Sequence, residues 1–107
     1  FFASWCVPCV IEHPQLMRLA REGVPVFGVG YKDQPADSRR FLEKHGNPYK
    51  RLGVDLPGRA SIDWGLYGVP ETYLIDRGGI IRWRWAGPIT PDVLEADLRP
   101  LLRQAAA

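Results

Sequence analysis

Segments with the apolar spacing of helices alternate along this chain with short apolar segments typical of strands. The helical spacing covers residues 7–22 and 34–45, a brief segment through Ala60, Ile62 and Leu66, and a final segment after Thr90. Strand-like segments lie at residues 24–31, 51–54, 72–75 and 80–86, and residues 1–5 resemble the end of a further strand. This order predicts an α/β fold in which helices flank a mixed sheet with one antiparallel edge.

Turn and capping residues mark the ends of these elements. Residues 76–79, Asp-Arg-Gly-Gly, separate the last two strand-like segments and predict a hairpin. Thr90 precedes a proline at the start of the final helix, as a capping residue does. Gly23 closes the first helix, whereas Pro14 should kink that helix and Pro100 should interrupt the last one late.

The second strand of the predicted hairpin alternates two kinds of residue. Ile81, Trp83 and Trp85 are apolar, and Arg82 and Arg84 lie between them. Because successive side chains of a strand point to opposite faces, we expect one apolar face and one solvated face.

Length and charge bound the range of functions. The chain has 107 residues, which suits one domain over residues 1–107. Its 14 Lys and Arg residues against 12 Asp and Glu residues leave a net charge of +2, and scattered basic residues argue against nucleic acid as a partner. No apolar run approaches the ~20 residues that a transmembrane helix needs. Because the chain starts within a strand-like segment, we expect an N-terminally truncated fragment, with any membrane anchor or signal peptide upstream of Phe1.

Both cysteines lie at the junction between the first strand and the first helix, as Cys6 and Cys9. This spacing lets the two sulfurs meet on the first helical turn, so the pair can form and open a disulfide. A helix N-terminus favours a thiolate, which lowers the pKa of Cys6 below the free value of roughly 8.5. We therefore expect Cys6 to expose the attacking sulfur and Cys9 to resolve the mixed disulfide.

Two other interpretations of the cysteine pair are open. A purely structural disulfide is one, although closing so short a loop restricts the unfolded chain little. A metal site is the other, because Cys6, Cys9 and His13 form a run that could hold copper or part of a zinc site. A lone helical histidine is more often a packed side chain, and the chain has no third cysteine. We expect no metal and no organic cofactor.

Neighbouring residues make the cysteine motif more specific. Trp5 precedes the pair, Pro8 lies within it and Pro14 follows five residues after Cys9. With these residues the chain resembles the thioredoxin superfamily, which implies a thioredoxin-like α/β fold with a C-terminal hairpin and helix.

The resemblance also gives a meaning to Val69-Pro70, which precedes residues 72–75. The superfamily carries a cis proline at this place, beside the active-site disulfide. A cis bond would hold backbone groups open toward an extended client segment. Without the cysteine motif, Pro70 would be interpreted as an ordinary trans proline at a strand entry.

Four segments are similar to the thioredoxin-like proteins of cytochrome c maturation, the CcmG/DsbE group, which is related to TlpA/ResA-like reductases. These segments are residues 5–14, 28–33, 46–49 and 67–76. In that group the acids that match Glu12 and Glu71 lie near the disulfide and are thought to tune it. A nearby carboxylate disfavours the Cys6 thiolate, so both acids would oppose the helix dipole and make the pair a reductant. A solvated helical charge is the alternative for Glu12.

The resemblance implies a bacterial periplasmic reductase, tethered by an upstream anchor, that reduces the cysteines of apocytochrome c or a mixed disulfide on that path. Its electrons would come from a membrane donor of the DsbD or CcdA type. The first alternative is a general TlpA/ResA-like periplasmic reductase, and the second is a copper-binding chaperone that uses Cys6, Cys9 and His13.

Client binding is expected at Trp5, Tyr31, Val69 and Pro70. Tyr31, Lys32 and Asp33 follow a predicted strand, where open α/β sheets place their sites, although these residues could equally form a solvated loop. We expect a surface position for His45 and a packing role for the remaining aromatics, namely Trp64, Trp83 and Trp85.

Overall fold

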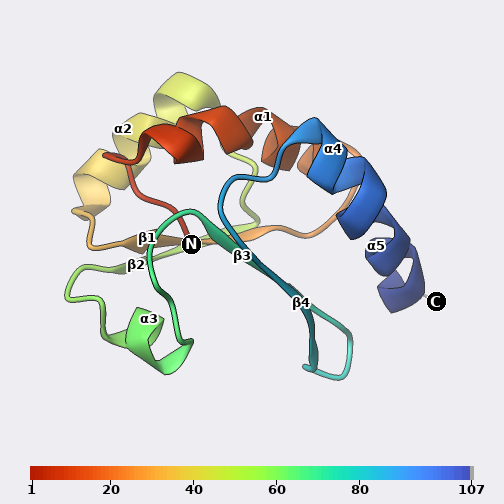
Figure 1. The fold of residues 1–107 in the computed structure, drawn as a ribbon. Coiled ribbons are helices and arrows are strands. Elements are labelled where there is room, and N and C mark those ends of the chain that lie inside the picture. The colour runs from red at the N-terminus through yellow and green to blue at the C-terminus, as the bar shows by residue number, and fades with distance from the viewer. Residues whose placement is uncertain (107) are drawn as a thin grey trace.

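Two pairs of strands form the centre of the computed structural model, which describes residues 1–106 (Figure 1). Strand β1 (Phe27–Tyr31) runs parallel to β2 (Arg51–Asp55). Strand β3 (Glu71–Ile75) runs antiparallel to β4 (Ile81–Ala86), with a register shift between Leu74 and Ile75. The predicted hairpin is thus confirmed, and both strand directions occur as expected of a mixed sheet.

The first two residues join the two strand pairs. Phe2 forms a parallel bridge to Gly30 of β1, where its N–H donates to the Val29 carbonyl (3.0 Å) and its carbonyl accepts from the Tyr31 N–H (2.7 Å). On the other side, the Glu71 N–H donates to the Phe1 carbonyl (3.2 Å). The N-terminal segment therefore occupies the middle position between β1 and β3.

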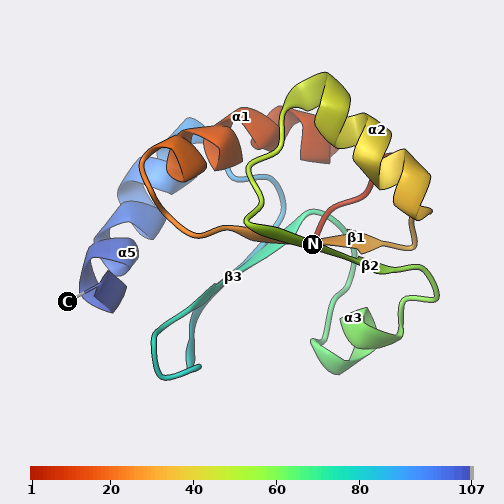
Figure 2. The same cartoon turned by 180° about the vertical axis from the view of Figure 1, so that it is seen from behind.

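Most helices cover one side of these strands. Helices α1 (Val7–Arg21) and α2 (Pro35–His45) lie on that side together with the C-terminal helical segment, and short α3 (Arg59–Asp63) lies on the opposite side, as both views show (Figures 1 and 2). No helix within residues 1–106 is long and apolar enough to cross a membrane.

Two apolar clusters fill the space between helices and strands. One contains both cysteines with Phe2, Ala3, Phe41 and Leu42. The other joins α1 to the C-terminal segment through Leu16, Leu19, Ile89, Leu94 and Leu98, and Trp83 and Trp85 pack against it. The packing role expected for these two tryptophans is confirmed.

The C-terminal segment is helical from α4 (Pro91–Val93) through the π-helical turn η1 (Leu94–Leu98) to α5 (Arg99–Ala106). Thr90 caps its start, because its hydroxyl oxygen accepts from the Val93 N–H at 3.2 Å. The expected interruption at Pro100 is wrong, since α5 continues beyond that residue. The wider turn of η1 precedes the proline, and such turns relieve the clash that a proline ring makes with a carbonyl four residues earlier.

Helix α3 does not bury the apolar residues whose spacing predicted it. Ile62 is 74% exposed, whereas Ser61 is buried. The reason is the carboxylate of Asp55, which accepts from the Ser61 N–H (2.9 Å), the Ser61 hydroxyl (2.8 Å) and the Gly58 N–H (3.1 Å). A polar anchor, and not an apolar stripe, fixes this short helix.

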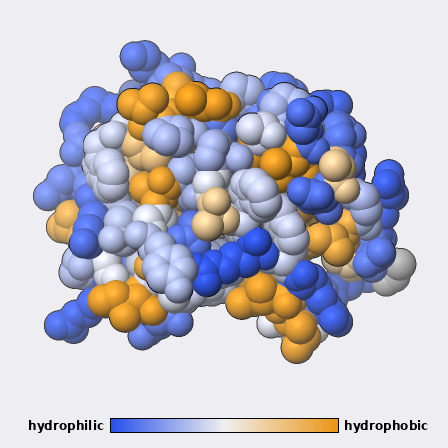
Figure 3. All heavy atoms as spheres, in the orientation of Figure 1, coloured by the Kyte–Doolittle hydropathy of each residue, from blue (hydrophilic) through white to orange (hydrophobic). Residues whose placement is uncertain are grey.

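Figure 3 shows other exposed apolar side chains as separate patches, one of them at the top, over α1.

Candidate functional site

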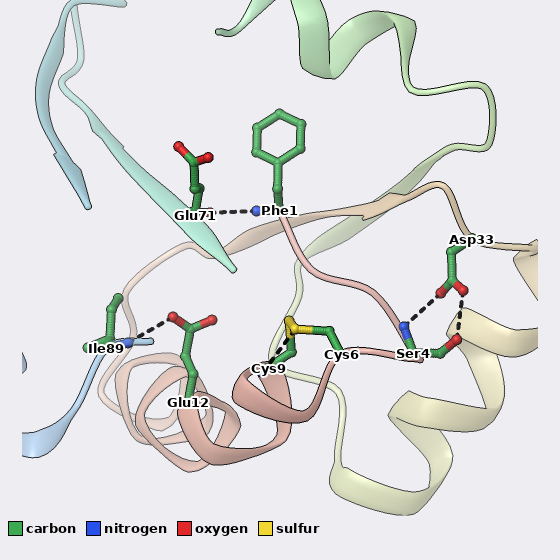
Figure 4. Close-up of a disulfide and its surroundings, with 8 residues drawn as sticks. All are labelled: Phe1, Ser4, Cys6, Cys9, Glu12, Asp33, Glu71 and Ile89. Atoms are coloured by element: carbon green, nitrogen blue, oxygen red, sulfur yellow. Dashed lines mark hydrogen bonds between the residues drawn. A yellow bond between two sulfur atoms is a disulfide. The ribbon is translucent and has the colours of Figure 1, made fainter. Parts of the chain in front are cut away.

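A disulfide between Cys6 and Cys9 lies at the N-terminus of α1 (Figure 4). Their Cα atoms are 5.3 Å apart, and Cys6 is the N-cap residue of the helix. The Cys9 N–H donates to the Cys6 sulfur at 3.2 Å. In the reduced protein the same N–H would stabilise a negative charge on that sulfur, as the dipole of a helix N-terminus also does.

Both cysteines are buried. Cys6 is 5% exposed and Cys9 2% exposed, because both pack in the cluster that contains Phe2 and Ala3. The expectation that Cys6 presents an exposed sulfur is therefore wrong for the disulfide form. A client must reach the pair through the residues around it.

Trp5, which precedes Cys6 in the chain, lies beside Tyr31 of β1. Trp5 is 58% exposed, its indole N–H donates to the Lys32 carbonyl at 3.3 Å, and its ring centroid lies 6.4 Å from that of Tyr31. The side-chain ammonium of Lys32 lies over the Tyr31 ring, 5.3 Å from its centroid. Two of the residues predicted to bind a client are thus neighbours, and one of them is adjacent to Cys6 in the chain.

Asp33 is buried, so its interpretation as part of a solvated loop is wrong. Its carboxylate accepts from the Ser4 N–H (3.0 Å), the Ser4 hydroxyl (2.6 Å) and the Ser38 hydroxyl (2.6 Å). These bonds tie the segment before Trp5 to the start of α2. Sequence reasoning missed both serines, because nothing in their spacing points to a shared partner.

Glu12 is buried in α1, which excludes the alternative of a solvated charge. It follows Cys9 by three residues, and residues three apart are neighbours on a helix surface. Its carboxylate accepts from the Ile89 N–H at 3.0 Å (Figure 4). Burial raises the pKa of Glu12 to about 7, although the bond from Ile89 opposes the change. Glu12 therefore exchanges its proton near neutral pH.

Glu71 is equally buried but forms an ion pair. Arg84 donates to one carboxylate oxygen through Nε (3.0 Å) and Nη2 (2.7 Å), and the N–H groups of Tyr67 and Gly68 donate to the other (2.7 and 3.1 Å). Burial raises the pKa of Glu71, but these bonds outweigh it and leave the pKa lowered. In Figure 4 the Glu71 carboxylate points away from the disulfide. The two glutamates therefore differ in surroundings and in protonation.

The Val69-Pro70 peptide bond is cis, as predicted. Val69 packs against the apolar cluster that contains both cysteines. One of the residues expected to form the client-facing wall, Val69, thus lies against the cluster that contains the redox pair.

His13 does not join the cysteines in a metal site. Its Nε2 lies 2.7 Å from the Gly46 carbonyl, which can only accept, so this nitrogen carries a proton. Burial lowers the pKa of His13, with a smaller opposing effect of the Gly46 bond. Within residues 1–106 no group of three His, Cys, Asp or Glu side chains could hold a metal ion.

Comparisons with known proteins agree with this geometry. A family model described as Redoxin matches residues 1–99. The chain belongs to the redoxin family. Among solved structures, this redoxin superposes on a putative thiol:disulfide interchange protein DsbE from Chlorobium tepidum with a TM-score of 0.80. The two sequences are 28% identical, and the match covers 100% of this chain and 77% of the other. The predicted thioredoxin-like fold is confirmed.

Curated relatives are more similar in sequence. This redoxin is 47% identical to the thiol:disulfide interchange protein HelX of Rhodobacter capsulatus over 95% of its length, and 46% identical to CycY of Rhizobium leguminosarum over 97%. It spans 58% and 56% of those two proteins, a little over half of their length.

Proposed function

We propose that this redoxin is a thiol-disulfide oxidoreductase whose reacting groups are Cys6 and Cys9. The observation that carries the proposal is the disulfide at the N-terminus of α1, with the Cys9 N–H donating to the Cys6 sulfur. That arrangement favours a thiolate on Cys6 and supplies the second thiol within reach. A purely structural disulfide would add little stability, because the loop it closes is short.

The reaction proceeds in two exchanges. The Cys6 thiolate attacks one sulfur of a client disulfide, which forms a mixed disulfide and releases one client sulfur as a thiolate. Cys9 then loses its proton and attacks the Cys6 sulfur, which releases the second client thiolate and forms the Cys6–Cys9 disulfide. Two electrons pass from the protein to the client, and a donor dithiol must return the protein to its reduced form.

Glu12 tunes this reaction. A carboxylate one helical turn beyond Cys9 disfavours a thiolate in its vicinity and opposes the helix dipole. With a pKa of about 7, Glu12 also carries a proton in part of the molecules at neutral pH. A pair whose thiolates are only moderately stabilised is a reductant, whereas strong oxidants hold a heavily stabilised thiolate. A similar effect of Glu71 is weaker, since Arg84 neutralises its charge.

The client we propose is apocytochrome c, reduced before haem attachment, or a mixed disulfide on that path. Support comes from the four segments similar to the CcmG/DsbE group and from relatives that are thiol:disulfide interchange proteins, including DsbE of Pseudomonas aeruginosa at 43% identity. This assignment places the protein in the bacterial periplasm, tethered by an anchor outside residues 1–107, with a membrane donor of the DsbD or CcdA type.

The test is reduction of an oxidised peptide that contains the C-x-x-C-H sequence. The reduced protein should convert the peptide to its dithiol and end as the Cys6–Cys9 disulfide, with one peptide reduced per protein, as mass spectrometry measures. A control peptide with its two cysteines in an unrelated sequence should be reduced at least about tenfold more slowly, a difference of ~1.4 kcal/mol. Equal rates would support the general TlpA/ResA-like reductase. Failure to reduce either peptide would contradict the oxidoreductase proposal.

A further inference from the structure

Arg84 of β4 holds the irregular segment that precedes β3. Its guanidinium donates twice to the Glu71 carboxylate and once more, through Nη2, to the Gly65 carbonyl at 2.5 Å. The Glu71 carboxylate in turn accepts from the N–H groups of Tyr67 and Gly68. Arg84 thus holds three backbone groups by hydrogen bonds: the Gly65 carbonyl directly, and the N–H groups of Tyr67 and Gly68 through Glu71.

Residues 64–70 have no helix or strand of their own, because α3 ends at Asp63 and β3 begins at Glu71. Residues 64–66 donate their backbone N–H groups to carbonyls of α3, whereas the N–H groups of Tyr67 and Gly68 are bound by the Glu71 carboxylate. The segment ends at Pro70 and carries Val69, which packs against the cysteine cluster. It also carries Tyr67, which is 91% exposed. Whatever fixes this segment also fixes the place of Val69 against the cluster that contains both cysteines.

The ion pair is suited to that task by its burial. Glu71 is 2% exposed, and the side chain of Arg84 keeps 35% of its surface accessible. A buried carboxylate without a partner strongly destabilises a protein, so the ion pair between Glu71 and Arg84 should persist in the folded state. The Arg84 guanidinium carbon also lies 5.3 Å from the centroid of the Tyr67 ring and 5.5 Å from that of Tyr73. A lysine could supply the charge but not the planar fork that reaches Glu71 and Gly65 together.

We propose that Arg84 is a positioning residue for client binding: through Glu71 and Gly65 it holds residues 65–70 in the conformation that receives a client peptide. The proposal rests on the function proposed above. Arg84 does not touch the sulfurs, so its effect is on the binding of a protein client and not on the exchange of the disulfide itself.

The test compares Arg84→Lys and Arg84→Gln with Arg82→Gln. Arg82 is the matched control, because it lies on the same strand but pairs with Asp76 at the exposed turn. The Arg84 variants should raise the KM for the oxidised C-x-x-C-H peptide by about tenfold, which equals ~1.4 kcal/mol, with little change in kcat. In Arg84→Lys, which keeps a positive charge beside Glu71, the equilibrium constant with glutathione should stay that of the parent protein. An unchanged KM in Arg84→Lys, or an equal rise in Arg82→Gln, would overturn the proposal.

A second measurement does not depend on the client. Hydrogen exchange at the amides of Tyr67 and Gly68, followed by NMR in the oxidised protein, should be accelerated by Arg84→Lys relative to amides of β1, and unaffected by Arg82→Gln. Unchanged exchange would overturn the inference even if the peptide is reduced. Faster exchange in a protein that reduces no peptide would support the role of Arg84 in the segment and contradict the proposed client.

A double variant tests whether Arg84 and Glu71 affect client binding through their ion pair or independently of each other. Arg84→Gln alone leaves the Glu71 charge buried without a partner, whereas Arg84→Gln with Glu71→Gln removes both charges. The rise in KM of the double variant should be smaller than the product of the two single effects. Independent, multiplying effects would contradict coupling through the ion pair.

Discussion

Glu12 and Glu71 are both buried carboxylates, yet their surroundings move their pKa values in opposite directions. Glu71 has an arginine and two backbone donors, which keep it ionised. Glu12 has the single backbone donor Ile89 and a pKa raised to about 7. Of these two carboxyl groups, only that of Glu12 changes charge near neutral pH, so Glu12 is the acid through which pH should affect the redox pair.

The raised pKa of Glu12 predicts how stability changes with pH. The folded protein binds this proton up to about pH 7, whereas the unfolded chain releases it near 4.5, so the folded state binds more protons between these values. The free energy of unfolding should therefore fall as pH rises from 4.5 to 7, by up to about 3 kcal/mol.

Urea denaturation at several pH values measures this dependence. Glu12→Gln should flatten the curve, because glutamine does not titrate, and Glu43→Gln, at an exposed position of α2, should leave it unchanged. The difference between the parent and Glu12→Gln curves isolates this group, because His13 and Glu71, whose pKa values are lowered, change stability in the opposite direction. A difference that is flat between pH 4.5 and 7, or one that rises, would contradict the state assigned to Glu12.

Asp33 gives a second prediction at the scale of the residue. Asp33→Asn replaces a carboxylate that accepts three hydrogen bonds, from Ser4 and Ser38, with an amide that has one acceptor oxygen. The free energy of unfolding should drop by about 1 to 3 kcal/mol. Thermal or chemical denaturation measures it, with the exposed Asp63→Asn as the control. If both variants lost the same stability, the anchoring of the segment before Trp5 would be contradicted.

At the scale of the element, patterns that depend on neighbours in sequence were predictive. The cap at Thr90, the end of α1 before Gly23 and the turn after Asp76 all follow from residues a few positions apart. Predictions failed where a residue distant in sequence, or a polar contact, decides which side chain is buried or where a helix ends. Ser61 is buried in place of Ile62 because Asp55 binds it, and helix formation passes Pro100 because a π-helical turn precedes that residue.

The β3–β4 hairpin shows the same limit within one strand. Alternation predicted that Trp83 and Trp85 face the core, and both pack there. It also predicted that Arg82 and Arg84 are solvated, and both residues are exposed. Arg84 in addition forms the ion pair with the buried Glu71 on the facing strand, a contact that alternation within one strand does not show. The offset between these two residues depends on the register between β3 and β4, which involves a second segment of the chain.

At the scale of the whole molecule, the site joins segments that are far apart in the chain. Glu12 of α1 binds the N–H of Ile89, and Phe1 pairs with Glu71. The motif Trp5-Cys6-Val7-Pro8-Cys9 indicated the fold and the redox pair through its resemblance to known thioredoxin-like proteins. It could not show that Cys6 is buried in the disulfide form or that Glu71 forms an ion pair with Arg84, because those facts depend on long-range packing.

The most direct test of the central claim is to trap the intermediate of the exchange. Cys9→Ser protein should form a stable mixed disulfide with the C-x-x-C-H peptide through Cys6, visible by mass spectrometry as one peptide per protein and removed by dithiothreitol. Cys6→Ser protein should trap far less. If Cys6→Ser accumulated the adduct instead, the assigned roles of the two cysteines would be reversed, and if neither variant did, the account of this protein as a thiol-disulfide oxidoreductase would be contradicted.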